Sequence, residues 1–354
     1  MIDANRICIV RLGGFGDVIN TMPALDAVRN AAPDAHLAWL VETAWKDVLP
    51  GPPRLNEVVA MPKREWISQL KEMTGVLALP GGLAEFVKKL RAHKFDLAID
   101  LHGNLRSGLA CRATGAPVRA GFAPGFCKEG NHLFTNRHYP VGEGRVHRID
   151  RALALVEQLG APAVTDRPRI DVADCRLAFA REVFARHGLS THPVVAVHPG
   201  TSDFGEYKRW PVERFRRVAG RLIERGYRVL VTWGPGERGL AERAAAGTEA
   251  VISPETASVA DLAGLLSMCD AFIGADSGPA VLAAAVDTPP VVIFGPKDPA
   301  VYAPRHPRTK VVEVEMACRP CSRRWCDDPR CMLDITLDRV MAAVDALLEE
   351  MEGN

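Results

Sequence analysis

The feature that most limits the fold of this chain is the alternation of short apolar runs with segments of helical periodicity. Near the start, the run ICIV is followed by a segment from Asp17 to Ala31 with apolar residues at helical spacing, and then by the run HLAWLVE. The stretches FDLAIDLHG and LRSGLACRATG repeat this order further along the chain. Strands that alternate with helices in this way are typical of βαβ units, which build a parallel sheet.

The same alternation begins again at about residue 193. VVAVHPG, YRVLVTW, DAFIGAD and PVVIFG are predicted strands, and helical patterns lie between them. At 354 residues the chain exceeds the length of about 250 residues at which a single core usually stops growing. We therefore predict an α/β fold of two doubly wound, Rossmann-like domains that face a central cleft, because such sheets bind ligands at the carboxyl ends of their strands. The predicted boundaries are 1–165, a linker over 166–192, a second domain over 193–332, and a final amphipathic helix within 333–354.

Charge and apolar content exclude several classes of protein. Lys and Arg total 44 against 43 for Asp and Glu, so the chain lacks the basic excess that favours nucleic acid as a partner. The opening residues MIDANRICIVRLGG hold too short an apolar run for a signal peptide or a membrane span. The 9 cysteines are dilute in a chain of this length, which favours a reducing compartment. We expect a cytoplasmic protein.

The loop RLGGFGDVI, after the first apolar run, carries a candidate catalytic group. The dinucleotide fingerprint G-x-G-x-x-G brings backbone amides to a pyrophosphate, but the order here is G-G-F-G-D. Asp17 at the helix entry would face a bound phosphate with like charge. Gly13 and Gly14 are therefore interpreted as a tight turn that exposes a carboxylate. Asp17 is either a helix N-cap or a general base facing the cleft, and the two roles are compatible.

Three loops at predicted strand ends of the second half suit a nucleotide diphosphate. GTSDFGEYKRWP supplies hydroxyls, backbone amides and an ammonium group. ADSGPA supplies a carboxylate, a hydroxyl and a helix N-terminus, and WGPGER supplies a carboxylate of the kind that holds ribose hydroxyls. Each loop alone is equally explained as a solvated loop or a helix cap. Together they predict a donor site at Thr201, Ser202, Lys208, Glu237, Asp276, Ser277 and Gly278.

Taken in order along the chain, these motifs resemble those of glycosyltransferase family 9, the ADP-heptose:lipopolysaccharide heptosyltransferases. The matching stretches are IVRLGGFGDVINTMPAL, DLAIDLHGNLRSGLA, HPGTSDFGEYKRWP, TWGPGE, and ADSGPAVLAAA followed by VVIFGPKDP. The resemblance implies the GT-B architecture, with the last helix crossing back to the first domain. It implies an inverting transfer of heptose from ADP-heptose to the inner core of lipopolysaccharide, by a cytoplasmic enzyme that contacts the inner membrane surface.

The resemblance also implies roles for single residues. Asp17 falls on the proposed catalytic base of the family, and the donor-site residues above fall on diphosphate, ribose and sugar contacts. Ala257 and Val259 fall near the adenine. The chain departs from the family pattern at Gly13 and Gly14, where serine or threonine is frequent, and at Val281, where histidine is found. No DxD pair stands at a predicted strand end, so we expect catalysis with no required metal and no cofactor besides the nucleotide sugar.

An anionic acceptor such as the lipopolysaccharide core requires cations in the first domain. Arg106 is the strongest candidate because it follows the predicted strand FDLAIDLHG. Each such cation is also explained as a solvated surface side chain. A basic face would suit an anionic membrane surface. The predicted acceptor contacts are Gly13, Gly14, Lys63, Arg64, Arg106 and Lys128, with Arg137, His147 and Arg151 as further candidates.

The segment CRPCSRRWCDDPRC gathers four cysteines, Cys318, Cys321, Cys326 and Cys331. Their spacing, C-x2-C-x4-C-x4-C, could hold a structural zinc ion or, as a weaker alternative, an iron–sulfur centre. Free thiols or a labile disulfide explain the cluster as well.

Rival functions stay open on the residues alone. An NAD-dependent dehydrogenase shares the doubly wound pattern but would need the missing fingerprint. A nucleotide-sugar epimerase on the same fold would act without an acceptor. The residues also allow a transferase that uses another nucleotide sugar on a cell-envelope glycan, and a catalytically inactive binding protein.

Overall fold

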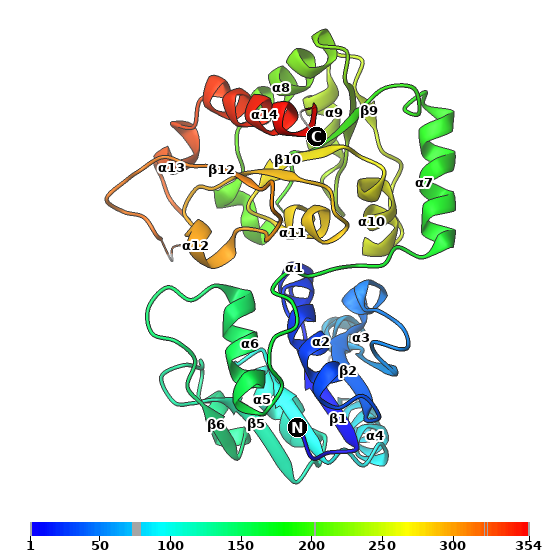
Figure 1. Ribbon diagram of the computed structural model, residues 1–354, viewed down its shortest axis with the longest axis vertical. Helices are drawn as coiled ribbons and strands as arrows, with labels where there is room; N and C mark the ends of the chain where they lie inside the picture. Colours follow the sequence, from blue (N-terminus) through cyan, green and yellow to red (C-terminus); the bar gives the residue numbers. More distant parts are fainter. Residues whose placement is uncertain (1, 73–78, 202, 322, 324, 353–354) are drawn as a thin grey trace. The chain divides into compact units, whose positions relative to one another are not determined.

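Each half of the chain folds around its own parallel sheet (Figure 1). The computed structural model describes residues 2–72, 79–201, 203–321, 323 and 325–352. The chain divides into two compact units, unit 1 (Met1–Pro168) and unit 2 (Arg169–Asn354). No helix in the described ranges has the length and apolar content needed to cross a membrane.

Unit 1 contains a 6-stranded sheet in the order β3-β2-β1-β4-β5-β6. Its central strands are almost wholly buried, as is typical of parallel strands covered by helices on both faces. The strands are β1 (Arg6–Val10), β2 (His36–Glu42), β3 (Glu57–Met61), β4 (Leu97–Asp100), β5 (Val118–Phe122) and β6 (Arg137–Tyr139). The helices are α1 (Phe15–Ile19), α2 (Met22–Ala31), α3 (Lys63–Glu72), α4 (Leu79–Ala92), α5 (Leu105–Ala113) and α6 (Arg148–Gln158), with 3-10 turns η1 (Thr43–Val48) and η2 (Asn131–Phe134).

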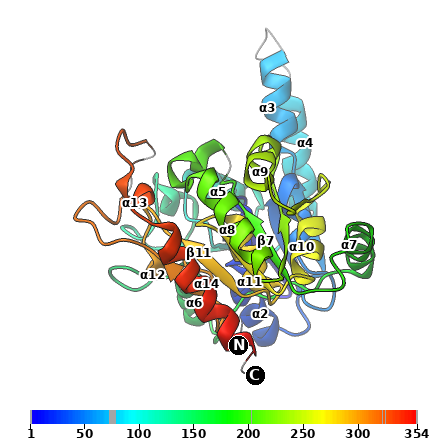
Figure 2. The ribbon, with the colours of Figure 1, turned by 90° about the horizontal axis from the view of Figure 1, so that it is seen from above.

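Helices α3 and α4 form a pair that extends outward from the rest of unit 1 (Figure 2). Trp66 of α3 contacts Phe86 of α4, with ring centroids 5.5 Å apart and ring planes at 81°. This edge-to-face contact holds the pair together away from the sheet.

Unit 2 contains a second 6-stranded sheet, in the order β12-β11-β10-β7-β8-β9. Its strands are β7 (Val194–His198), β8 (Arg228–Val231), β9 (Val251–Ile252), β10 (Ala271–Ala275), β11 (Pro290–Ile293) and β12 (Lys310–Val312). Its helices are α7 (Asp174–Arg186), α8 (Val212–Glu224), α9 (Arg238–Ala245), α10 (Val259–Ser267), α11 (Gly278–Ala285), α12 (Pro299–Tyr302), α13 (Arg330–Leu333) and α14 (Leu337–Glu352), with the 3-10 turn η3 (Asp203–Lys208).

The two sheets have the same strand order when each is counted from its own first strand. In both, the order is 3-2-1-4-5-6, which is the doubly wound order of dinucleotide-binding folds. The prediction of two Rossmann-like α/β domains is therefore confirmed. In each sheet the strand order reverses next to the first strand, between β1 and β4 and between β7 and β10. Ligands of such folds bind at this point, outside the carboxyl ends of the strands.

The segment 166–192, predicted as a linker, contains helix α7, which packs against α10 within unit 2. At the other end of unit 2, helix α14 packs against β11, β12 and α8. The apolar residues of α14, from Leu337 to Leu348, belong to the core of unit 2, and Trp210 Nε1 donates a hydrogen bond of 2.9 Å to the carbonyl of Ile335 just before this helix. The apolar face of α14 is thus used within unit 2. That this helix crosses back to the first domain stays a prediction.

Candidate active site

The glycine-rich loop after β1 places Asp17 in the first turn of α1. Gly14 has a φ of +74°, a left-handed conformation that glycine adopts without strain, and it is the N-cap of α1. No side chain caps this helix, so the interpretation of Asp17 as an N-cap is wrong. The carboxylate instead points to Arg11, the first residue after β1.

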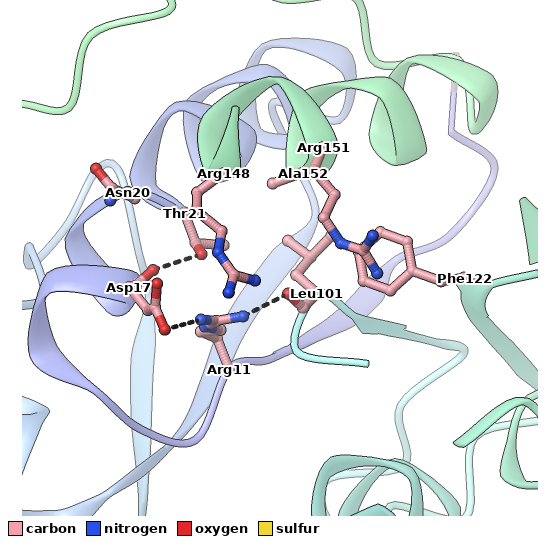
Figure 3. A pocket seen from close by; sticks show the side chains of 9 residues that line it. All are labelled: Arg11, Asp17, Asn20, Thr21, Leu101, Phe122, Arg148, Arg151 and Ala152. Carbon is pink, nitrogen blue, oxygen red and sulfur yellow. Dashed lines mark hydrogen bonds and ion pairs between the residues drawn. The ribbon is translucent and has the colours of Figure 1, made fainter. Parts of the chain in front are cut away.

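Arg11 and Asp17 form a close ion pair in which only Asp17 reaches solvent. Arg11 Nη2 lies 2.7 Å from Asp17 Oδ2, and the two side chains are 6% and 37% exposed. Arg11 Nη1 also donates a hydrogen bond of 2.9 Å to the carbonyl of Leu101 (Figure 3). The guanidinium is therefore held from two sides, whereas Asp17 is held by Arg11 from one side.

The electrostatic surroundings favour the ionised form of Asp17. Burial alone would raise the pKa of Asp17, but the positive charges of Arg11 and Arg148 and the hydrogen bond from Arg11 outweigh it, and the pKa lies below its ordinary value. Burial lowers the pKa of Arg11, and the charge of Arg148 acts in the same direction while Asp17 opposes it. The charge of Arg148 thus acts on both members of the ion pair.

Helix α6 brings two more guanidinium groups to this place (Figure 3). Arg151 lies over the ring of Phe122, with its guanidinium carbon 4.0 Å from the ring centroid, and donates a hydrogen bond to the carbonyl of Phe126. Burial, and then the charges of Arg148 and Arg11, lower the pKa of Arg151 to about 10. A small pocket of about 10 Å³ lies among these groups. It is lined by Arg11, Asp17, Asn20, Thr21, Leu101, Phe122, Arg148, Arg151 and Ala152.

Asp100, the last residue of β4, fixes the neighbouring loop. It is fully buried and accepts hydrogen bonds from the backbone of His102 and Gly103 and from Ser107 and Asn131, at 2.6 to 3.1 Å. Burial nevertheless raises its pKa. His102 in this loop receives a long hydrogen bond of 3.4 Å from the backbone N–H of Leu12, and burial followed by the charge of Arg11 lowers its pKa to about 3. His102 is therefore neutral at pH 7.

Two of the predicted acceptor-binding cations share a carboxylate that was not among the predicted site residues. Glu42, at the end of β2, is 11% exposed, and its Oε1 lies 2.8 Å from Lys63 Nζ and 3.5 Å from Arg106 Nη1. A Cβ on Gly13 would lie 3.1 Å from the same oxygen, so the glycine loop lies against Glu42. Lys63, Arg106 and Gly13 are thus brought together around Glu42, and this group keeps one net positive charge.

The other predicted acceptor residues are more dispersed. Lys128 is exposed and its backbone N–H donates a hydrogen bond of 2.8 Å to the carbonyl of Gly103. Arg64 lies in α3, and its side chain is outside the described part of the structure. Arg137 is exposed on β6, whereas His147 is buried and accepts a hydrogen bond from the backbone of Ile149 at the start of α6.

In unit 2, a lysine and an aspartate from two predicted donor loops meet. Lys208 Nζ at the end of η3 lies 2.6 Å from Asp276 Oδ2, and the two side chains are 19% and 12% exposed. Ser277 follows as the N-cap residue of α11, yet its side chain makes no capping hydrogen bond. Its Oγ is buried and has no hydrogen-bond partner within the described residues. Gly278 is the first residue of α11, so its backbone lies at the positive end of the helix dipole.

Glu237, predicted to hold ribose, is buried and bonded to the protein backbone. It is 5% exposed, its Oε1 accepts a hydrogen bond of 2.8 Å from Thr201 N–H, and its Oε2 accepts one of 3.1 Å from Gly234 N–H. Nε2 of the buried His198 lies 3.7 Å from Oε2, and burial lowers the pKa of this histidine to about 4. Glu237 therefore joins the loops after β7 and β8, and its role toward ribose stays a prediction.

The remaining residues predicted to bind the donor are Thr201, Ser202, Ala257 and Val259. The Thr201 hydroxyl donates to the carbonyl of Gly205 at 2.8 Å, which stabilises η3. Ser202 lies outside the described residues. Ala257 is exposed, and Val259 begins α10, whose N-cap Ser258 forms a capping box with Asp261. Contacts of these residues with adenine stay predictions.

The cysteine cluster contains free thiols. Cys318, Cys321, Cys326 and Cys331 are unpaired, and no group of three or more His, Cys, Asp or Glu within the described ranges is placed to hold a metal ion. Burial raises the pKa of Cys331, and the neighbouring Cys318, Cys321 and Cys326 contribute in the same direction. The structural zinc site therefore finds no support in the structure.

Three side chains at the sheet edge of unit 1 were not predicted from the sequence. Arg11 stood inside the quoted glycine loop, and its position directly after an apolar strand was a usable signal. Arg148 and Glu42 gave no local signal in the sequence, because charged residues are common at the ends of helices and strands.

Comparison with known proteins decides the family. The model of glycosyltransferase family 9 (heptosyltransferase) matches residues 83–331. The chain belongs to glycosyltransferase family 9. This membership confirms the predicted enzyme class and decides against a dehydrogenase. Among relatives, lipopolysaccharide heptosyltransferase 1 of Pseudomonas aeruginosa is 29% identical over 97% of this chain and 98% of its own.

Solved structures agree with the GT-B fold. A family 9 glycosyltransferase from Veillonella parvula is similar with a TM-score of 0.81 and 24% identity, over 99% of this chain and 98% of its own. The E. coli heptosyltransferase WaaC with ADP is similar with a TM-score of 0.76 and 23% identity, over 97% and 99%. The predicted fold class is thereby confirmed.

Proposed function

We propose that this family 9 enzyme transfers a heptose from ADP-heptose to an anionic acceptor of the lipopolysaccharide core, with inversion at the anomeric carbon. The observation that carries the donor half is the group formed by Lys208, Asp276 and Ser277 at the N-terminus of α11. A buried hydroxyl without a partner among the described residues, beside an ammonium and a helix N-terminus, suits the oxygens of a diphosphate. The solved structure of WaaC with ADP supports ADP as the nucleotide.

Asp17 is proposed as the general base. Its carboxylate accepts the proton of the acceptor hydroxyl as that oxygen attacks the anomeric carbon, and the bond from this carbon to the β-phosphate oxygen breaks. Lys208 and the N-terminus of α11 stabilise the charge that builds on the departing ADP. This scheme requires the carboxylate of Asp17 and the ammonium of Lys208 to act on the same pair of donor and acceptor during the reaction. It needs no metal ion, since an ammonium and backbone amides take the stabilising role.

The acceptor site is proposed to lie along the ends of β1, β2 and β4. Lys63 and Arg106 would reach the acceptor from their positions around Glu42, and Lys128 from the adjoining loop. An acceptor anchored in a lipid layer would bring the enzyme to the inner face of the cytoplasmic membrane, where a basic face is attracted to anionic lipids.

The test is a transfer assay with purified protein, ADP-heptose and deep-rough lipopolysaccharide, read by mass spectrometry. The expected result is an acceptor whose mass has grown by one heptose, with release of ADP. Conversion of the donor without an acceptor would indicate an epimerase instead. Transfer from a different nucleotide sugar would change the donor, and ADP binding without turnover would indicate an inactive binding protein.

A further inference from the structure

The lining of the pocket beside Asp17 carries more positive than negative charge. It holds three guanidinium groups, from Arg11, Arg148 and Arg151, and among the described residues that line it Asp17 is the one carboxylate. The nearby Asp100 is occupied by four hydrogen-bond donors. A carboxylate or phosphate that entered this pocket would meet guanidinium groups from two separate elements, the loop after β1 and helix α6.

The ion pair with Arg11 also conflicts with the role of Asp17 as a base. A carboxylate whose Oδ2 lies 2.7 Å from a guanidinium nitrogen is directed away from an acceptor hydroxyl. The lowered pKa of Asp17 makes it a poor proton acceptor in this arrangement. Efficient proton transfer requires that the carboxylate first leave Arg11.

We propose that an anionic group on the acceptor, a carboxylate or a phosphate, binds Arg148 and replaces Asp17 on Arg11, which releases Asp17 to accept the proton of the attacking hydroxyl. This inference rests on the proposed function, and it identifies the chemical group of the acceptor that activates Asp17 as the base. Arg11 and Arg148 are positioning residues in this account, and Asp17 remains the catalytic residue.

The two members of the ion pair differ in the way that such an exchange needs. Arg11 is 6% exposed and is held by the carbonyl of Leu101, so it stays in place. Asp17 is 37% exposed and can rotate toward solvent. The pocket of about 10 Å³ has room for about one oxygen atom, so an anion would insert one oxygen and keep the rest of the acceptor outside. Hydrogen bonds from a guanidinium group to a charged carboxylate or phosphate oxygen are stronger than those to water, which favours this exchange over displacement by water.

The exchange would protect the donor from hydrolysis. Water carries no charge and leaves Asp17 bound to Arg11, so the base stays inactive until an anionic acceptor arrives. An acceptor with its anionic group neutralised would be expected to bind poorly and to react slowly for the same reason.

The first test measures anion binding and needs no turnover. Acetate or inorganic phosphate is titrated into the full chain by calorimetry, with ADP present in excess to occupy the donor site. We expect wild type to bind at least one of the two anions, and the stronger of them identifies the acceptor group. Arg148→Gln should weaken this binding at least about fivefold, because a charge-assisted contact is lost. Arg112→Gln, on the exposed face of α5, is the matched control and should bind like wild type.

The decisive variant in this titration is Asp17→Asn. The exchange predicts that the anion binds this variant more tightly than wild type, since the competing carboxylate is gone. A purely structural ion pair predicts no gain. Unchanged binding by Asp17→Asn, unchanged binding by Arg148→Gln, or no binding of either anion to wild type would each overturn the inference.

The second test is the pH dependence of transfer. The charged and titratable groups that act on Asp17 are Arg11 after β1, Arg148 on α6 and His102 after β4, whose pKa is about 3. Arg151 on α6 lines the same pocket. Asp17 is the proposed base, so its ionisation, rather than that of His102, is expected to set the acid limb. That limb reports the free enzyme in kcat/KM and the enzyme–substrate complex in kcat. With the acceptor varied, we expect the kcat limb at the higher pH, and coincident limbs would contradict the exchange.

Arg148 variants separate binding from chemistry. Arg148→Gln should raise KM for the acceptor about tenfold while KM for ADP-heptose is unchanged, and Arg148→Lys should recover part of the loss. Equal KM values in Arg148→Gln and wild type would refute the contact. If no acceptor is glycosylated at all, the proposed function fails while the titration with acetate and phosphate still decides the exchange.

Discussion

Replacing Gly200 with alanine is expected to break the contact that joins the loops after β7 and β8. A Cβ at position 200 would collide with Oε2 and Cδ of Glu237, and even the more distant Oε1 would lie only 2.5 Å away. Glu237 has no room to yield, because it is 5% exposed and a Cβ on Gly234 would lie 2.9 Å from it on another side. The carboxylate must therefore rotate away from its backbone partners.

The cost follows from the two hydrogen bonds that Glu237 loses. Its bonds to Thr201 N–H and Gly234 N–H are 2.8 and 3.1 Å long. Hydrogen bonds to a charged group are worth about 1.5–3 kcal/mol each, so the free energy of unfolding should fall by about 3–6 kcal/mol. For a unit of this size, 1 kcal/mol corresponds to roughly 2–4 °C, so we expect Tm of unit 2 to fall by roughly 6–24 °C.

Scanning calorimetry of the full chain measures this loss, together with ADP affinity, which should fall as the loops move. Gly220→Ala is the matched control, since nothing lies within 4 Å of an added Cβ in helix α8 and the change should stabilise the helix by about 0.5–1 kcal/mol. Combining Gly200→Ala with Glu237→Asp should restore part of the stability, because the shorter carboxylate leaves room. A Gly200→Ala protein with the same Tm as wild type would refute the reasoning.

Four further outcomes can be measured with the same protein. Asp17→Asn should lose turnover by about 10²–10⁴-fold while ADP affinity by calorimetry is kept, and normal turnover would refute the base. Lys208→Ala should weaken ADP binding about tenfold or more, against no change if its ion pair with Asp276 is purely structural. Because the folded-state pKa of Asp17 is lowered from 3.8, its stabilising effect is present above that value and is lost as pH falls through the folded pKa. Denaturant unfolding should therefore show an advantage of wild type over Asp17→Asn at pH 7 that shrinks in acid. Chelator-treated protein, with its metal content measured, should keep full transfer activity, and a loss restored by zinc would contradict the metal-independent scheme.

The two sheets could be predicted from the sequence because their central strands are buried on both faces and form continuous apolar runs. The helix α7 could not, because its three buried residues, Ala180, Val183 and Phe184, leave only a narrow apolar stripe. The short strand β6 was not predicted for a related reason, since a strand of 3 residues shows no periodicity. Its place is set by the neighbouring strand rather than by its own residues.

For the candidate site, the sequence indicated candidate residues but not the side chains and backbone groups that they contact. It indicated Lys208 and Asp276 as donor residues, and the structure pairs them. It could not show that the carboxylate of Glu237 accepts hydrogen bonds from backbone amides inside unit 2. The residues next to Glu237 in the sequence do not distinguish a buried carboxylate from an exposed one. The meeting of Arg11 with Arg148 depends on how α6 packs, which no local pattern encodes.

The shared strand order has a consequence for how this enzyme can change. The loop after β1 and the loop after β7 follow the first strand of their sheets, so they occupy corresponding places in two copies of one topology. The loop after β1 leads to the carboxylate of Asp17, and the loop after β7 leads to the ammonium of Lys208. In the proposed scheme, substitutions in one loop therefore change the recognition of one substrate and leave the site for the other unchanged. Donor preference and acceptor preference could then vary separately.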